Sequence, residues 1–275
     1  YPDAKTFKLE QNYRSTKIIV DAANSIIKKN KNQLDKTVFT NNADGEKIQL
    51  IRAVTDNEEG RFIAQSIFEE KMQNQLPNRH FAILYRTNAQ SRSVEEALRR
   101  MNIAYKIYGG LSFYQRKEIK DLIAYLRLVI NPNDEEAIKR IINYPSRGIG
   151  KTTLDKLIVL ANQKDQSISD IITQAQNFHQ LKSPFKKLKD FHTMMETFRI
   201  MAHEKDAYDT AYYVAKSTGL LKNLREDKTI EGVSRFENIE ELLNGIKEFV
   251  EDDTSEKEKT LANYLQEIAL LTTLD

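Results

Sequence analysis

The sequence contains no cysteine and only four histidines among its 275 residues. The lack of cysteine excludes disulfides, zinc–thiolate sites and a cysteine nucleophile. The histidines form no ligand-like pair, so no metal site is predicted. The sequence also lacks a run of about 18 apolar residues and opens without a signal peptide, so we expect neither membrane insertion nor secretion.

Charge is nearly balanced overall but unevenly distributed along the chain. The net charge is +2, while residues 86–120 carry eight basic side chains against three acidic ones, a local +5. Residues 231–260 carry ten acidic side chains against four basic ones, a local −6. Such asymmetry is consistent with a polyanionic partner on one side, but charge runs are also common on solvated helix faces. The sequence leaves both interpretations open.

Strand-like and helix-like segments alternate through the first 110 residues. The segments TFKLE, KIQLIRAV, HFAILYR and IAYKIY are rich in apolar and β-branched residues and predict strands. Apolar residues recur at helical spacing in residues 16–30, 58–72 and 94–101. This alternation predicts an α/β layer with a largely parallel sheet.

Only helical patterns remain after residue 110. The predicted helices cover residues 115–130, 134–143, 153–164, 185–203, 207–217, 235–250 and 257–271. The predicted fold class is therefore α/β followed by all-α, with one domain over residues 1–110 and a helical domain over residues 111–275.

The segment YPSRGIGKTT, residues 144–153, superficially resembles the phosphate loop of ATP-binding proteins. A P-loop requires glycine where Pro145 stands and a strand before the loop, and neither is present. The flanking patterns instead predict a helix, a Gly-Ile-Gly turn and a second helix, with Thr152 at capping-box spacing. Glycines and a helix N-terminus favour a bound anion, so a DNA phosphate flanked by Arg147 and Lys151 is one interpretation. An ordinary tight connection between helices is the other.

Several segments carry a resemblance to a known family. LEQNYRSTKIIVDAAN resembles motif IV of the superfamily 1 DNA helicases of the UvrD/PcrA/Rep type. Five further segments are similar to that family, most closely to its PcrA branch: ILYRTNAQSRSVEEAL, YGGLSFYQRKEIKDLIAYLRLVINPND, IINYPSRGIGKTT, SRFENIEELL and YLQEIALLTTLD. Together they cover nearly the whole chain.

The resemblance implies that the chain is a fragment of such a helicase. The family's ATP phosphate loop, its Asp-Glu magnesium motif and its late arginine motif have no counterpart in the sequence. We therefore expect part of the second RecA-like domain over residues 1–110, followed by the helical domain inserted into it. The RecA-like parallel sheet, with its flanking helices, should be incomplete and expose an apolar edge.

The resemblance assigns Gln11, Tyr13 and Arg14 to an ATP site. In the family, the residue matching Tyr13 stacks on adenine and the one matching Arg14 reaches the γ-phosphate, which makes Arg14 the expected catalytic residue. An arginine in that role is worth about 10³ to 10⁵ in rate. ATP with Mg²⁺ is the expected cofactor of the complete enzyme, and no tightly bound cofactor is expected in this fragment.

The resemblance also assigns residues to DNA. It places Arg86 and Asn88 on a single-stranded track, although Asn88 fits a helix cap equally well. It assigns Arg147, Gly148, Ile149, Gly150, Lys151 and Thr152 to duplex phosphates without sequence preference. Phe113 lies in a segment of mixed aromatic and basic residues, and we expect it to pack inside the protein.

The resemblance thus implies part of an ATP-dependent 3′-to-5′ DNA helicase of repair and replication, cytoplasmic and bacterial, with the fragment alone inactive. Its expected partners are single-stranded and duplex DNA and the missing first RecA-like domain and remainder of the second, and not a membrane. The resemblance also allows repair or replication proteins, or RNA polymerase, as partners of the helical domain. The alternatives are a non-enzymatic repair adaptor that clamps duplex DNA and a protein-binding module.

Overall fold

The computed structural model describes residues 5, 7–31, 36–253 and 257–272. The chain forms two compact units, Tyr1–Ala53 and Val54–Asp275, here called the N-terminal unit and the main unit. Each unit is described by itself. Among the described helices, none is long and apolar enough to cross a membrane.

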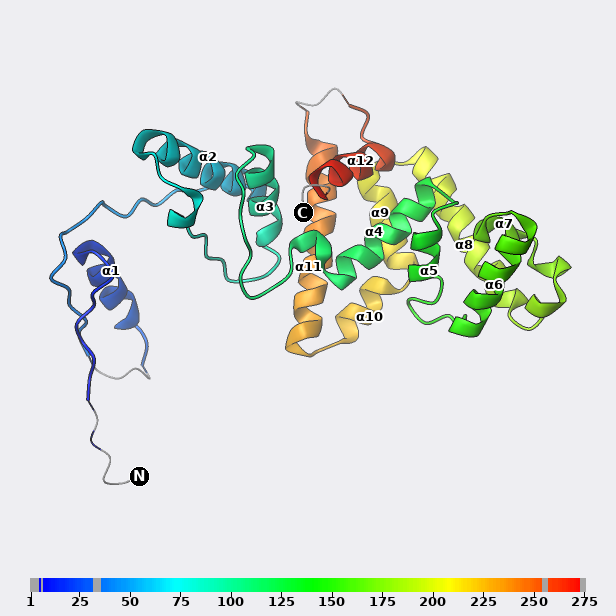
Figure 1. Cartoon of the computed structure of the whole chain (residues 1–275), viewed down its shortest axis with the longest axis horizontal. Helices are drawn as coiled ribbons and strands as arrows, with labels where there is room; N and C mark the ends of the chain where they lie inside the picture. The colour runs from blue at the N-terminus through cyan, green and yellow to red at the C-terminus, as the bar shows by residue number, and fades with distance from the viewer. Residues whose placement is uncertain (1–4, 6, 32–35, 254–256, 273–275) are drawn as a thin grey trace. The chain divides into compact units, whose positions relative to one another are not determined.

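The described secondary structure is helical in both units (Figure 1). The N-terminal unit contains α1 (Lys17–Ile27). The main unit contains α2 (Asp56–Asn74), α3 (Ser91–Arg100), α4 (Lys117–Ile130), α5 (Glu135–Ile141), α6 (Lys151–Lys164), α7 (Ile168–Thr173), α8 (Phe185–Glu204), α9 (Ala207–Ser217), α10 (Leu220–Glu226), α11 (Ile230–Glu251) and α12 (Leu261–Thr272). Short 3₁₀ turns occur at η1 (Asn78–His80), η2 (Phe113–Gln115), η3 (Ala175–Asn177) and η4 (His179–Leu181).

The prediction of a RecA-like parallel sheet with flanking helices is wrong for the residues that the structure describes. The four strand-like segments, except for Thr6, lie within that range, and none of their described residues forms a strand. The one strand-type pairing among the described residues is an isolated parallel bridge between Gln11 and Phe39, which lie outside these segments. The apolar side chains of the segments are largely open to solvent: Leu9 is 84% exposed, Leu50 98% and Leu84 95%. A strand is stable only when a neighbouring strand takes up its backbone hydrogen bonds, and here these segments do not pair with one another.

The helices predicted from apolar spacing are confirmed, with boundaries shifted by a few residues. Capping explains several of the starts: the side chain of Thr55 accepts a hydrogen bond from the backbone N–H of Glu58 at the start of α2. Ser167 and Asp170 form a capping box at α7, a helix that the periodicity did not predict because it is so short. The short helix α10 was missed for the same reason.

Most of the apolar core of the main unit lies around α4, which packs against α5, α8, α9, α11 and α12. Leu122, Tyr125 and Leu126 of this helix are fully buried. The packing prediction for Phe113 is confirmed, since its ring is fully buried at the start of the same core. A smaller apolar cluster joins α2 to α3 through Ala64, Val94 and Leu98.

The two apolar clusters and the two compact units suggest different divisions of the chain. The smaller cluster ends at Tyr105 and the larger one begins at Phe113, so the clusters divide near residue 110. The compact units instead divide between Ala53 and Val54. The predicted domain boundary at residue 110 therefore stays a prediction.

A buried arginine joins α3 to α11 inside the main unit. Arg92 is only 2% exposed, and its guanidinium lies 2.7 Å from Glu241, 3.0 Å from Glu248 and 3.3 Å from Glu96. Burial by itself lowers the pKa of Arg92, but Glu96 and Glu241 outweigh it, and the net shift is upward. Arg92 is therefore a permanent buried cation whose charge is compensated by these carboxylates.

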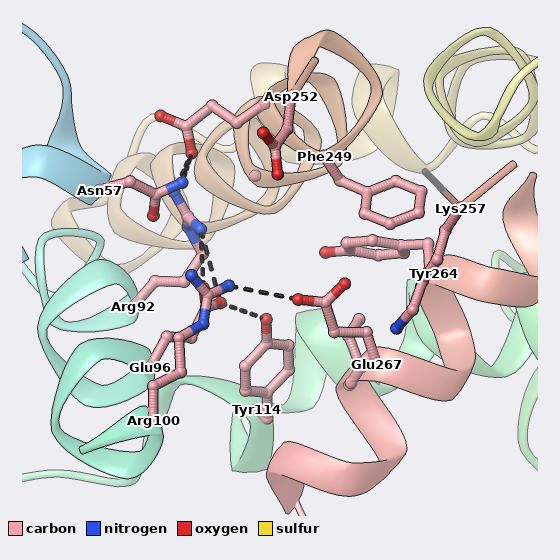
Figure 2. Close-up of a pocket in the computed structure, with 13 residues that line it drawn as sticks. Asn57, Arg92, Glu96, Arg100, Tyr114, Phe249, Asp252, Lys257, Tyr264 and Glu267 are labelled. Carbon is pink, nitrogen blue, oxygen red and sulfur yellow. Dashed lines mark hydrogen bonds and ion pairs between the residues drawn. The ribbon is translucent and has the colours of Figure 1, made fainter. Parts of the chain in front are cut away.

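Hydrogen bonds extend this arginine cluster to neighbouring elements (Figure 2). The Tyr114 hydroxyl of η2 donates to Glu96 over 2.6 Å, and the Asn57 amide of α2 donates to Glu248 over 2.7 Å. Arg92 belongs to the basic segment and Glu241 and Glu248 belong to the acidic segment of the sequence. Part of the charge asymmetry is thus neutralised inside the protein.

We predict that Arg92→Ala lowers the free energy of unfolding by about 3 to 5 kcal/mol, because it leaves Glu96 and Glu241 buried without their cation. Arg100→Ala is the matched control on α3, since its pair with Glu267 is exposed and should change stability by less than about 1 kcal/mol. Urea unfolding followed by circular dichroism measures both. Equal losses in the two variants would contradict the prediction.

Candidate functional site

The segment QNYRS in the N-terminal unit forms a tight turn just before α1. The Asn12 side chain accepts hydrogen bonds from the backbone N–H groups of Arg14, over 2.9 Å, and Ser15, over 2.8 Å. The Asn42 amide donates to the carbonyls of Tyr13 and Ser15. The turn is therefore held by Asn12 from within and by Asn42 from outside.

This turn presents the predicted ATP-site residues to solvent. Tyr13 is 78% exposed, Arg14 is exposed, and the Tyr13 hydroxyl donates to the Gln11 amide oxygen over 2.9 Å. An exposed ring beside an exposed guanidinium on a braced backbone can contact a base and a phosphate. Because Arg14 is not buried in a core, it is open to a ligand.

Arg86 and Asn88 lie in the loop that leads into α3. The Gln90 side chain braces this loop by accepting hydrogen bonds from the backbone N–H groups of Arg86 and Thr87. The Asn88 amide points to the Ser234 hydroxyl of α11 at 3.4 Å, a long hydrogen bond, and the N-cap residue of α3 is Gln90. Both Arg86 and Asn88 are exposed.

The Gly-Ile-Gly turn connects α5 to α6 and is organised by a residue that precedes it. The Asn143 side chain accepts hydrogen bonds from the backbone N–H groups of Arg147, over 2.9 Å, and Ile149, over 3.0 Å. Ile149 is 1% exposed and anchors the turn in the core. Gly148 has φ of +69°, which only glycine adopts easily.

Arg147 faces into the protein. Its Nη1 donates to the carbonyls of Ile141, Tyr144 and Pro145 at 3.0 to 3.2 Å. The guanidinium also lies over the ring of Tyr125, 5.5 Å from its centroid. The structure thus gives Arg147 a bracing role behind the turn, and its predicted DNA contact remains untested.

The last three predicted residues of the turn face outward. Gly150, Lys151 and Thr152 are exposed at the start of α6. The N-cap of α6 is Gly150 rather than the predicted Thr152, and glycine has no side chain with which to cap the helix. The first N–H groups of a helix have no acceptor within the helix, so this end can receive an anion.

Two residues of this region were missed by the sequence analysis. Asn143 orders the turn, and its position at the end of a predicted helix was the only signal. Lys187 of α8 donates from its ammonium to the Gly148 carbonyl over 3.0 Å, across 39 residues of sequence. The run of lysines in SPFKKLKD could have drawn attention to Lys187, but nothing local connects it to the turn.

The structure brings together residues 147–152, Asn143 and Lys187, while Arg86 and Asn88 lie in the loop before α3. Gln11, Tyr13 and Arg14 belong to the N-terminal unit. Among the described residues, no group of three His, Asp or Glu side chains has a metal-binding arrangement.

A cavity of about 360 Å³ adjoins the Arg92 cluster and is lined by residues of α2, α3, α11, α12 and η2 (Figure 2). Several of its polar side chains are engaged with one another, as in the pairs Arg92–Glu96 and Arg100–Glu267. The cavity is therefore explained by the junction between these helices, and we assign no ligand to it.

Comparison with known proteins identifies the family of this chain. The model of the UvrD-like helicase C-terminal domain matches residues 7–275, so the chain belongs to this family.

Two individual relatives are similar to the chain over its whole length. The chain is 37% identical over its whole length to the ATP-dependent DNA helicase PcrA of Staphylococcus aureus. It is equally similar, 37% over the whole chain, to the ATP-dependent DNA helicase PcrA of Staphylococcus epidermidis. The chain spans 37% of the length of each of these relatives.

A buried tyrosine beside the Gly-Ile-Gly turn, Tyr125, should make the stability of the protein depend on pH in the alkaline range. The Tyr125 hydroxyl donates to the Tyr144 carbonyl beside the turn, and burial raises the pKa of Tyr125 from 10.0 to about 12. Between these values the folded state retains a proton that the unfolded chain has lost. The free energy of unfolding should therefore fall as pH rises from 10 to 12, and this shift should have no effect below pH 10.

In Tyr125→Phe the free energy of unfolding should fall less steeply with pH, because one titrating group is removed. The change in slope corresponds to at most one proton. The remaining fall reports Tyr114, Tyr144 and Tyr264, whose pKa values burial also raises. At neutral pH the variant should lose about 1 kcal/mol with the hydroxyl hydrogen bond. Urea unfolding at a series of pH values measures both effects, and identical slopes in the two proteins would contradict the assignment.

Proposed function

We propose that this chain is part of an ATP-dependent 3′-to-5′ DNA helicase that unwinds duplex DNA in repair and replication. Membership of the UvrD-like helicase C-terminal family supports this proposal, as does the similarity to relatives named ATP-dependent DNA helicases. The chain contributes one side of an ATP cleft together with contacts to single-stranded and duplex DNA. Taken alone, it hydrolyses no ATP.

The proposed contact with duplex DNA rests on the start of α6. A Cβ at Gly150 would meet no described heavy atom within 4 Å, and the backbone there has an ordinary φ of −75°. Neither crowding nor backbone strain within the protein therefore requires glycine at this position. Asn, Asp or Ser would cap α6 better, whereas glycine leaves its N–H groups open to a DNA phosphate.

The turn of the N-terminal unit fits one side of a nucleotide site. The exposed Tyr13 ring would stack on adenine, Gln11 would hold the Tyr13 hydroxyl, and Arg14 would direct its guanidinium to the γ-phosphate. ATP with Mg²⁺ supplies the free energy for strand movement in the complete enzyme. Arg14 stabilises negative charge that develops on the transferred phosphoryl group.

The remaining parts of the proposal rest on the family. Arg86 and Asn88, exposed in the loop before α3, would follow single-stranded DNA. The domain division at residue 110, the partner domains, a cytoplasmic bacterial location and further repair, replication or transcription partners belong to the same proposal. Relatives that are helicases give no support to a non-enzymatic adaptor.

We predict that Gly150→Asp weakens binding of the chain to duplex DNA about ten-fold, because a carboxylate at the start of α6 repels phosphate. Binding to single-stranded DNA should change by less than about two-fold. Gly150→Asn is the matched control, since it caps α6 equally well without the charge. Fluorescence anisotropy with labelled duplex and single strand measures both affinities.

The stability of the two variants separates binding from folding. Both should be as stable as the original chain or more stable by a few tenths of a kcal/mol, since Asp and Asn are good N-caps. Equal weakening of duplex and single-strand binding by Gly150→Asp would remove the turn from the proposed function.

In the complete helicase, Arg14→Ala should lower the rate of ATP hydrolysis by about 10³-fold or more while nucleotide binding is partly retained. Steady-state ATPase assays and binding of a fluorescent nucleotide analogue measure the two quantities, with Lys17→Ala on α1 as a nearby exposed control. Unchanged hydrolysis in Arg14→Ala, or turnover by the isolated chain, would argue against this site.

A further inference from the structure

Among the residues that the structure describes outside the Gly-Ile-Gly turn, Lys187 is the only one whose charged side chain forms a hydrogen bond to a glycine of the turn. It lies in the first turn of α8, and its ammonium donates to the Gly148 carbonyl over 3.0 Å. A Cβ at Gly148 would lie 2.5 Å from this ammonium. Gly148 thus leaves room for the lysine, in addition to adopting a positive φ.

Helix stability does not explain a lysine at this position. The positive end of the macrodipole lies at the N-terminus of α8, where a cation is unfavourable, and its first turn contains no acidic residue. Among the described residues, no carboxylate pairs with Lys187, whose one recorded partner is the Gly148 carbonyl. A lysine ammonium has three donors, so two remain for solvent or for an anion.

Two exposed lysines therefore flank the open start of α6. Lys151 is its first residue, and Lys187 reaches the same turn from α8. The side chains that brace the turn, Asn143 and Arg147, are bonded to its backbone. The outward side thus combines unpaired helix N–H groups with two cations, an arrangement that suits the closely spaced phosphates of a duplex.

We propose that Lys187 is a second duplex-phosphate ligand, which also holds the Gly-Ile-Gly turn in its binding conformation. This inference rests on the proposed duplex contact of the turn and extends it from one segment to two. The phosphate contact comes from two helices far apart in sequence, and it carries no base specificity because only phosphates are contacted.

The test compares three variants of the 275-residue chain. Lys187→Met removes the charge and keeps an apolar stem, and Lys187→Arg keeps the charge. Lys189→Met removes another exposed charge of α8, about 200° around the helix from Lys187. Affinity for labelled duplex DNA is measured by fluorescence anisotropy between about 50 and 200 mM salt, and thermal unfolding is measured for each variant.

Lys187→Met should weaken duplex binding several-fold and make the slope of log affinity against log salt shallower by about 0.9, because one fewer phosphate is neutralised. Lys187→Arg and Lys189→Met should keep the original slope. An unchanged slope in Lys187→Met would overturn the inference, even with weaker binding, since the lysine would then be only a brace. An equal change of slope in Lys189→Met would also overturn it.

The failure of this inference can be told apart from that of the proposed function. If Gly150→Asp and Gly150→Asn both bind duplex as tightly as the original chain does, the turn itself is not a duplex contact. If Gly150→Asp weakens binding and Lys187→Met leaves the salt slope unchanged, the turn contacts DNA without Lys187.

Discussion

The main unit depends on the buried cation Arg92, because an unpaired guanidinium in the interior would be strongly destabilising. Its carboxylate partners come from its own helix and from α11, and Tyr114 and Asn57 bond to those carboxylates in turn. The requirement extends to Gly245, where a Cβ would lie 2.7 Å from the guanidinium. Four elements are thus fixed to one another by the need to satisfy one charge.

The Gly-Ile-Gly turn repeats this use of arginine on a smaller scale. Arg147 directs its guanidinium at three carbonyls and two rings, so the inner side of the turn is fixed by a side chain. On the exposed side of the turn, by contrast, the cations are two lysines, Lys151 and Lys187. A rigid fork of donors suits convergent internal acceptors, whereas a flexible, well-hydrated ammonium suits a phosphate that comes and goes.

The proposed nucleotide turn follows the same principle with neutral side chains. Asn12 and Asn42 take up the backbone hydrogen bonds of the turn, so Tyr13 and Arg14 need no internal partner to be held in place. In both candidate sites an asparagine side chain, Asn12 or Asn143, orders the backbone, and exposed side chains or helix N–H groups remain available to a ligand. The candidate sites therefore combine a rigid backbone with an open outer surface.

What the sequence by itself determined is local: helices from apolar spacing, the turn between α5 and α6, and the family motifs. The sheet predicted from the sequence was wrong, because a strand is stable only when neighbouring strands pair with it. In the strand-like segments, Leu9, Leu50 and Leu84 are exposed instead. Only the tertiary structure paired Arg92 with Glu241 across 149 residues and brought Lys187 to Gly148 across 39. Pattern and propensity act over a few residues, whereas burial of charge and strand pairing depend on which distant segments meet.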